Sequence, residues 1–227
     1  MTHDIAFFED EHKYLVDGEE VPSVTTILNY MSDVEYGGIN KAVLDQASRR
    51  GSLVHEYTEL IDCDADPDEV EYEVLGYLKA YKQFLHDYKP DWWHIEKILY
   101  NESVGYIGTA DRIGTIDGEI SIVDIKTLAS PSKMAKFTVS SQTIAYRRAY
   151  IDMLLADKKL PTQTIHRYAL YLGKDGDYNL VDLCEYDMKY GYNSWGMFLA
   201  CWELYKKIQK LKASKPIKKG KDNGKTT

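Results

Sequence analysis

The fold of this chain is decided by one stretch, Gly105-Tyr-Ile-Gly108-Thr-Ala-Asp111-Arg-Ile-Gly-Thr-Ile-Asp117-Gly118-Glu-Ile-Ser-Ile-Val-Asp124-Ile-Lys126. Apolar residues lie on both sides of Asp117-Gly118, a dipeptide that favours a tight hairpin turn. The stretch therefore predicts two consecutive strands, over residues 105–116 and 119–125. Because side chains alternate between the two faces of a strand, Asp124 and Lys126 share one face and Ile125 points into the core.

A carboxylate and an ammonium group at the end of an otherwise apolar strand need a chemical reason. Burying either charge is costly unless it faces an opposite charge, a metal or a substrate. The hairpin would also bring Asp111 of the first strand toward Asp124. Two carboxylates beside Lys126 favour one divalent metal and one activated water. The alternative is a surface ion pair on an edge strand, since Asp-x-Lys alone is a common tripeptide.

The rest of the chain predicts helices and further strands around this hairpin. Before it we expect two short strands within residues 5–16 and a short helix that is opened by residues 22–28 and broken at Gly37-Gly38. A helix over 39–61, interrupted near Gly51, should follow. We then expect a loop over 62–69, a helix over 70–88 and a strand over 93–100. After it we expect a helix over 139–156, strands over 165–172 and 180–185, and a final helix over 188–211.

This order predicts an α/β fold with a mixed central sheet flanked by helices, in a single domain. A length of 227 residues with 44% apolar residues suits one well-filled globular domain. We expect that domain, with its N-terminal hairpin and helices, over residues 1–212, and a basic flexible tail over 213–227. No apolar run reaches membrane-spanning length and no N-terminal signal pattern occurs, so we expect a cytoplasmic protein that binds no membrane.

Charge and cysteines narrow the possible partners and cofactors. The net charge is −8, yet residues 206–227 contain nine lysines and one acidic residue. This basic end is either a solubilising segment or an electrostatic arm that holds a phosphate backbone, and both remain open. The chain has three scattered cysteines, an odd number that argues against a disulfide framework and against a tetracysteine zinc or iron–sulfur site.

Four motifs occur in an order that resembles the PD-(D/E)xK nuclease superfamily, in its RecB-like exonuclease branch. They are Arg50-Gly51-x-x-x-His55, Gly108-x-x-Asp111, Asp124-x-Lys126 and Gln142-x-x-x-Tyr146. The segment Pro22-Ser-Val-Thr25 is similar to one found in phage members and in mitochondrial genome-maintenance exonucleases. The resemblance implies a restriction-endonuclease-like core, with the order helix, three strands, helix, strand.

The resemblance also implies roles for particular residues. His55, Asp111, Asp124 and the Ile125 carbonyl would bind Mg²⁺ or Mn²⁺, and Lys126 would be the catalytic lysine. Gln142 and Tyr146, four apart on one helix face, would steady the site and contact substrate.

Five further residues have supporting or DNA-contacting roles in this interpretation. Glu96 matches an acidic position on the first strand of the core. Ser23 and Thr25 suit a phosphate contact at a helix start, although helix capping explains them equally well. Arg50 and Arg112 are candidates for contacts with a DNA backbone, and solvated arginines are the alternative.

Together these residues predict a metal-dependent exonuclease that hydrolyses DNA to 5′-phosphate products. Its setting would be phage-type recombination, repair or replication in a bacterial or phage-infected cell. Its partners would be single-stranded DNA or a duplex end, with a single-strand-binding or annealing protein as a further candidate. We expect no nucleotide cofactor, since no Walker-type glycine-rich motif is present. The alternatives are a structure-specific endonuclease of the same fold and a non-catalytic DNA-binding recombination accessory protein.

Overall fold

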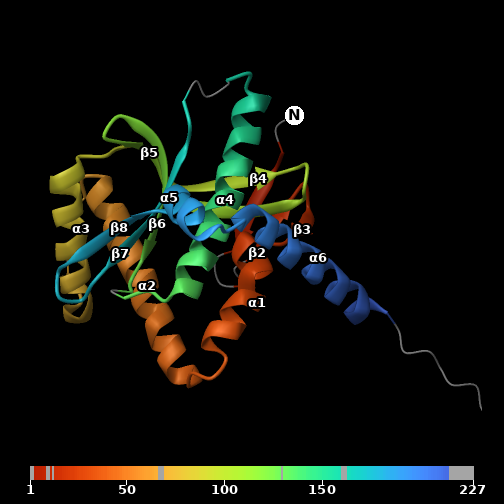
Figure 1. The fold of residues 1–227 in the computed structure, drawn as a ribbon, viewed down its shortest axis with the longest axis horizontal. Helices are drawn as coiled ribbons and strands as arrows, with labels where there is room; N and C mark the ends of the chain where they lie inside the picture. The colour runs from red at the N-terminus through yellow and green to blue at the C-terminus, as the bar shows by residue number, and fades with distance from the viewer. Residues whose placement is uncertain are drawn as a thin grey trace, which may run out of the picture.

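The computed structural model describes residues 3–8, 11, 13–65, 69–128, 130–159 and 163–214. These residues form a single α/β domain with a small N-terminal sheet, a five-stranded mixed sheet and six α-helices (Figure 1). The last helix, α6 (Ser194–Ala213), continues to one residue beyond the expected domain boundary. The rest of the predicted basic tail, from residue 215 onward, lies outside the described residues.

The central sheet confirms the predicted mixed arrangement. Its strands, in spatial as well as sequence order, are β4 (Asp91–Asn101), β5 (Tyr106–Ile116), β6 (Glu119–Lys126), β7 (His166–Leu172) and β8 (Tyr178–Asp182). Neighbouring strands are antiparallel except β6 and β7, which are parallel. A parallel pair needs a crossover connection, and α4 (Lys133–Ala156) supplies it. The hairpin predicted from the sequence is the pair β5–β6.

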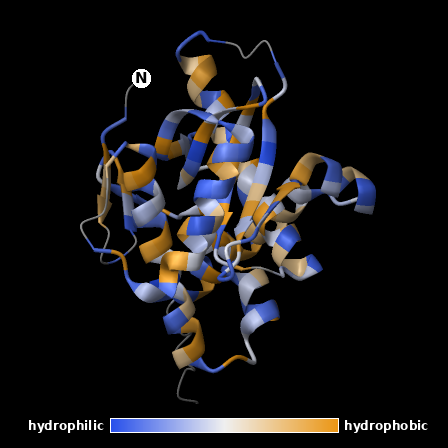
Figure 2. Ribbon diagram, turned by 90° about the vertical axis from the view of Figure 1, so that its left-hand side faces the viewer, coloured by the Kyte–Doolittle hydropathy of each residue, from blue (hydrophilic) through white to orange (hydrophobic). Residues whose placement is uncertain are grey.

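Helices cover both faces of this sheet. On one face, α1 (Val24–Tyr36), α4 and α6 pack in a core that includes Ile122 of β6. On the other, α2 (Lys41–Asp62) and α3 (Leu75–Tyr88) pack over Val123 and Ile125. Figure 2 shows the striping of the helices, with hydrophobic and hydrophilic residues alternating around them. Within the described ranges, no helix combines the length and the apolar character that a bilayer crossing requires.

The N-terminal residues form a three-stranded antiparallel sheet of β1 (Ile5–Phe8), β2 (Lys13–Val16) and β3 (Glu19–Val21). The sequence predicted the first two strands and missed the third, which is only three residues long. Tyr14 and Val16 pack against Ile107 of β5, which attaches this sheet to the central one. Next to that contact, the Ile107 amide donates to the Pro22 carbonyl at 3.2 Å, which fixes the chain just before α1.

The predicted interruption near Gly51 is wrong, because α2 is one continuous helix. A glycine inside a helix costs only about 1 kcal/mol relative to alanine, and packing outweighs it. Here Val54 and Tyr57 bury one face of α2 against the core it shares with α3. The predicted break at Gly37-Gly38 is confirmed, since Gly37 is the C-cap of α1.

Three predicted boundaries toward the C-terminus also need correction. Helix α4 begins at Lys133 rather than at residue 139, since the Ser132 hydroxyl caps it by accepting from the Ala135 amide at 2.9 Å. Strand β8 ends at Asp182, whose side chain caps α5 (Leu183–Tyr190), so the predicted strand 180–185 is too long. The predicted helix over 188–211 is interrupted at Gly191, which has a left-handed φ of 65° and terminates α5 before α6 starts.

The glycine of Gly108-x-x-Asp111 is required by close packing between β5 and the helices above it. A Cβ atom at Gly108 would lie 2.8 Å from Cε1 of Tyr146 on α4 and 3.2 Å from Cγ2 of Val24 on α1. We predict that Gly108→Ala destabilises the protein by about 1–3 kcal/mol, the usual cost of overpacking a core. Thermal unfolding measures this loss. Gly38→Ala is the control, since its Cβ would meet nothing within 4 Å, and equal losses in both variants would contradict the packing explanation.

Candidate functional site

The site forms where β5 and β6 separate. The last residues that pair between these two strands are Arg112 and Val123. The residues that follow in the direction of the opening are Asp111 and Asp124, and they do not pair with each other. The Ile125 amide instead donates to Oδ2 of the Asp111 side chain at 2.6 Å. One carboxylate thereby takes the place of a backbone partner. Strand β6 continues beyond this point by pairing with β7 through Asp124, Ile125 and Lys126.

His55 reaches this opening from α2. Its Nε2 lies 3.1 Å from the Ile125 carbonyl oxygen, and its Nδ1 lies 3.6 Å from Glu96 Oε1 and 3.8 Å from Asp111 Oδ2. Burial favours the neutral ring, but the Asp111 and Glu96 carboxylates outweigh it and raise the pKa of His55. The two carboxylates therefore favour a positive charge on the ring, and they would favour a bound metal cation in the same way.

Glu96 enters the site through an unusual backbone conformation. It falls opposite Asp111, between the register pairs Ile95–Arg112 and Lys97–Ala110, and its φ is 47°. A left-handed φ at a residue other than glycine is uncommon and costs on the order of 1–3 kcal/mol. Such strain is typical of functional positions. Here the strained backbone directs the Glu96 carboxylate toward His55. Glu96 therefore belongs to the site itself, whereas the sequence predicted only a supporting role for it.

His55, Glu96 and Asp111 form a group that could hold a metal ion. One possible ligand atom from each residue lies within 4.8 Å of the other two. A donor set of imidazole and carboxylate groups suits Mn²⁺, and carboxylate oxygens also suit Mg²⁺. Of the ligands implied by the sequence, His55 and Asp111 are in this group and the Ile125 carbonyl contacts the His55 ring. Asp124 lies on the neighbouring strand, and Glu96 completes the group of three.

Asp124 and Lys126 lie on one side of β6, as the strand periodicity predicted. Lys126 Nζ is 2.5 Å from Asp124 Oδ2, and the Asp124 side chain is fully buried. Among the described residues, Asp124 Oδ1 has no hydrogen-bond partner. Burial raises the pKa of Asp124, and the Asp111 carboxylate raises it further, against the opposing effect of Lys126. A buried carboxylate with an unused oxygen is a position that a cation would stabilise.

Gln142 and Tyr146 lie on the face of α4 that covers the sheet. Gln142 Nε2 donates to the Tyr146 hydroxyl at 3.0 Å, and both side chains are buried. Burial raises the pKa of Tyr146, and the nearby Asp124 and Asp111 carboxylates raise it further. The tyrosine hydroxyl therefore remains protonated beside the acidic group. Gln142 and Tyr146 share one face of α4, as their spacing of four predicted.

Arg112 lies behind the site and is fully buried. Its guanidinium donates to Asp62 Oδ2 at 2.5 Å, to Glu96 Oε1 at 3.2 Å and to the Asp111 carbonyl at 2.8 Å. It also donates to the Thr58 hydroxyl at 3.2 Å. A contact between Arg112 and an external DNA backbone, which the sequence suggested, is excluded by this burial. Arg112 instead supports the strand segment that presents Asp111 and Glu96.

Of the remaining predicted residues, Ser23 and Thr25 lie at the start of α1 and Arg50 lies in the middle of α2. The Ser23 hydroxyl caps α1 by accepting from the Thr26 amide at 3.0 Å, and it also lies 2.9 Å from the Thr25 hydroxyl. Capping therefore accounts for Ser23, and Thr25 contacts the capping hydroxyl. Arg50, on α2, stacks over the ring of Tyr77 at 5.8 Å and faces the cavity beside Lys126.

Sequence reasoning missed the partners of Arg112. One of them is Asp62, the last residue of α2. Its carboxylate accepts hydrogen bonds from Arg112 and, at 2.6 Å, from the Tyr81 hydroxyl of α3. Nothing in the local pattern distinguishes Asp62 from the other acidic residues around it, because residues 62–69 resemble an acidic loop. The one available signal was Arg112 itself, since an arginine inside a buried strand demands a carboxylate partner.

Comparison of the chain with models of known protein families, and with curated proteins, finds no match. The geometry of the site therefore carries the functional argument.

The buried pair Arg112–Asp62 should be essential for stability. We predict that Arg112→Met or Asp62→Leu alone lowers the free energy of unfolding by about 3–5 kcal/mol, since each leaves a buried charge without its partner. The double variant should lose much less than the sum of the two, which denaturant unfolding would show. Strictly additive losses would contradict a direct pairing.

The group of three should bind Mn²⁺. We predict that His55→Gln and Glu96→Gln each weaken Mn²⁺ binding at least roughly tenfold, the loss expected even for a partner outside the coordination sphere. Isothermal calorimetry measures this affinity. His94→Gln is the matched control, because His94 lies on the same strand as Glu96 and outside the group. An unchanged affinity in both site variants would exclude a metal at this position.

Proposed function

We propose that this protein is a metal-dependent deoxyribonuclease of the PD-(D/E)xK type, acting as an exonuclease on DNA ends or single strands. The observation that carries the proposal is the convergence of Asp111, Asp124 and Lys126 with His55 and Glu96 at one opening of the central sheet. Phosphodiester hydrolysis needs charge stabilisation and an activated water, and these residue types suit both tasks.

The order of elements supports the same proposal. Helices α2 and α3 precede three antiparallel strands, β4 to β6, and α4 then leads to the parallel strand β7. This is the order of helix, three strands, helix and strand that the resemblance implies. The four sequence motifs come from α2, β5, β6 and α4, and all four meet at the same opening.

The residues at the opening fit a divalent cation. His55, Glu96 and Asp111 would hold it, with the unused oxygen of Asp124 on the adjacent strand as a further ligand. A bound Mg²⁺ or Mn²⁺ would supply Lewis-acid polarisation of the phosphoryl group and a lowered pKa for water.

Lys126 acts in this proposal as an ammonium group. Burial disfavours its charge, but the Asp124 and Asp111 carboxylates outweigh burial and raise the pKa of Lys126. A protonated lysine cannot accept a proton, so its tasks are to orient the attacking water and to stabilise negative charge on the phosphoryl oxygens. Asp124, 2.5 Å away, holds the ammonium in position.

The proposed chemistry predicts a sharp loss of activity when the strand pair is altered. With Mg²⁺ or Mn²⁺ present, Lys126→Ala and Asp124→Ala should lower the rate of DNA cleavage roughly 100-fold or more, because the developing charge loses its stabilising groups. The assay is digestion of end-labelled single- and double-stranded DNA with each end blocked in turn. Added chelator should abolish cleavage by the unaltered protein.

Lys174→Ala is the control, since Lys174 is an exposed residue between β7 and β8. Full cleavage by the Lys126 and Asp124 variants would refute the proposal. Circular single-stranded DNA tests the mode of action, because an obligate exonuclease leaves it intact.

A further inference from the structure

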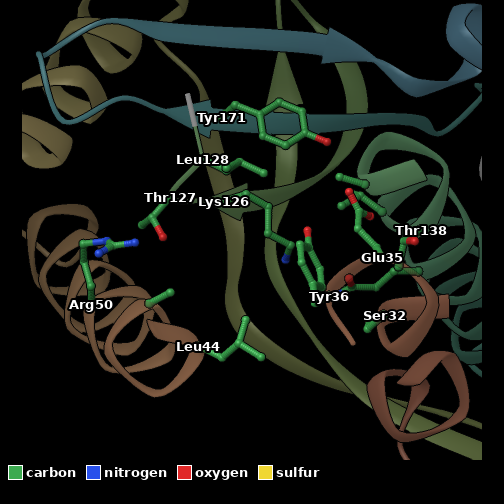
Figure 3. A pocket seen from close by; sticks show the side chains of 14 residues that line it. Ser32, Glu35, Tyr36, Leu44, Arg50, Lys126, Thr127, Leu128, Thr138 and Tyr171 are labelled. Atoms are coloured by element: carbon green, nitrogen blue, oxygen red, sulfur yellow. The ribbon is translucent and has the colours of Figure 1, made fainter. Parts of the chain in front are cut away.

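A cavity of about 360 Å³ adjoins the site on the side of Lys126. Figure 3 shows Arg50 and Leu44 of α2 on one side of it, Glu35 and Tyr36 of α1 on the other, and Lys126 between them. The volume lies in the range of small-ligand pockets, roughly 300–1,000 Å³. The cavity is therefore large enough for a ligand group and lies next to the proposed catalytic residues.

The walls of the cavity are largely apolar. Leu44 and Ala47 come from α2, Ala135 and Val139 from α4, and Leu128 from the segment after β6. The ring of Tyr36 adds an aromatic face. Such walls suit a flat apolar or heteroaromatic group, because they offer van der Waals contact and stacking rather than charge.

Three residues that line this cavity each carry a polar atom that is buried and, within the described part of the chain, has no hydrogen-bond partner. These atoms are Oε2 of Glu35, Nε of Arg50 and the hydroxyl oxygen of Tyr171. Buried polar groups are normally paired, and an unpaired one lowers stability unless a ligand or water satisfies it. Three of them around one cavity indicate an occupant that carries both donors and acceptors.

The positions of Glu35 and Tyr171 are fixed by the fold. The Ser132 hydroxyl, which caps α4, hydrogen bonds to Oε1 of Glu35 and leaves Oε2 free. Tyr171 pairs in register with Lys126 on the neighbouring strand and is only 1% exposed. The Glu35 carboxylate is thus held by the residue that caps α4, and the Tyr171 side chain is buried on the strand beside Lys126. Polar groups placed in advance in this way lose less freedom when a ligand binds.

We propose that this cavity binds the nucleobase of one unpaired nucleotide that flanks the scissile phosphate. The inference rests on the proposed function, because Lys126 connects the two sites. A nucleobase is flat, stacks on aromatic rings and presents donors and acceptors along its edge. Glu35 would accept from a base N–H group, Tyr171 would donate or accept, and Arg50 would donate.

A pocket for a single nucleobase restricts the substrate. In a duplex the edge of a base is engaged with its partner and its faces are stacked, so the base must be unstacked and unpaired before it enters a pocket. The cavity therefore selects a substrate that is single-stranded at the nucleotide being cleaved. A duplex would be used only after its end had opened.

The proposal is tested with short single-stranded oligonucleotides that each lack one base. An abasic nucleotide at the register beside the cleaved bond should lower kcat/KM roughly tenfold, the size expected when stacking is lost together with a hydrogen bond. Abasic nucleotides at other registers should change it little. Tyr171→Phe and Glu35→Gln should each reduce this preference for an intact base to about threefold. Tyr150→Phe, a buried tyrosine that does not line the cavity, should leave the preference unchanged.

The outcomes separate the two proposals. If Mn²⁺-dependent cleavage disappears in Asp124→Ala but abasic and intact strands are cleaved at equal rates, the nucleobase pocket is refuted and the nuclease stands. If the protein cleaves no DNA, fluorescence anisotropy with Ca²⁺ in place of Mn²⁺ measures binding of the same strands. A preference for the intact base that falls in Tyr171→Phe then upholds the pocket without the nuclease. Equal binding of both strands refutes the pocket.

Discussion

The buried guanidinium of Arg112 is the interaction on which the rest of the site depends. It joins Asp62 and Thr58 of α2 to Glu96 of β4 and to the backbone at Asp111 of β5. A fully buried charge of this kind is tolerated only with several well-placed partners, because desolvation is costly. The same contacts fix the helix that carries His55 relative to the two strands that carry the carboxylates. Arg112 thus acts as a positioning residue.

Asp111 shows how one side chain can serve both the fold and the site. Its carboxylate accepts from the Ile125 amide, which would otherwise be a buried donor at the point where β5 and β6 separate. Asp124 and Lys126 lie on β6 just beyond the last residue that pairs with β5. The fold therefore gives up backbone pairing at one place and recovers part of it through an acidic side chain with a chemical role.

The sequence allowed prediction of those features that depend on local periodicity. Asp124 and Lys126 share a face because they are two apart in a strand, and Gln142 and Tyr146 because they are four apart in a helix. The partner of Arg112 could not be predicted, since Asp62 is 50 residues away along the chain. Nor could the strained φ of Glu96, because a left-handed glutamate has no signature in the pattern around it.

The group of His55, Glu96 and Asp111 joins α2, β4 and β5, so its ligand atoms come together only in the folded chain. Any cation bound there favours the folded state over the unfolded one by mass action. The added stability is about 2.7 kcal/mol when the free cation exceeds its dissociation constant 100-fold. Acidic residues that repel one another without a cation would then be joined by it, as by a cross-link. The supply of metal would govern the persistence of the protein as well as its chemistry.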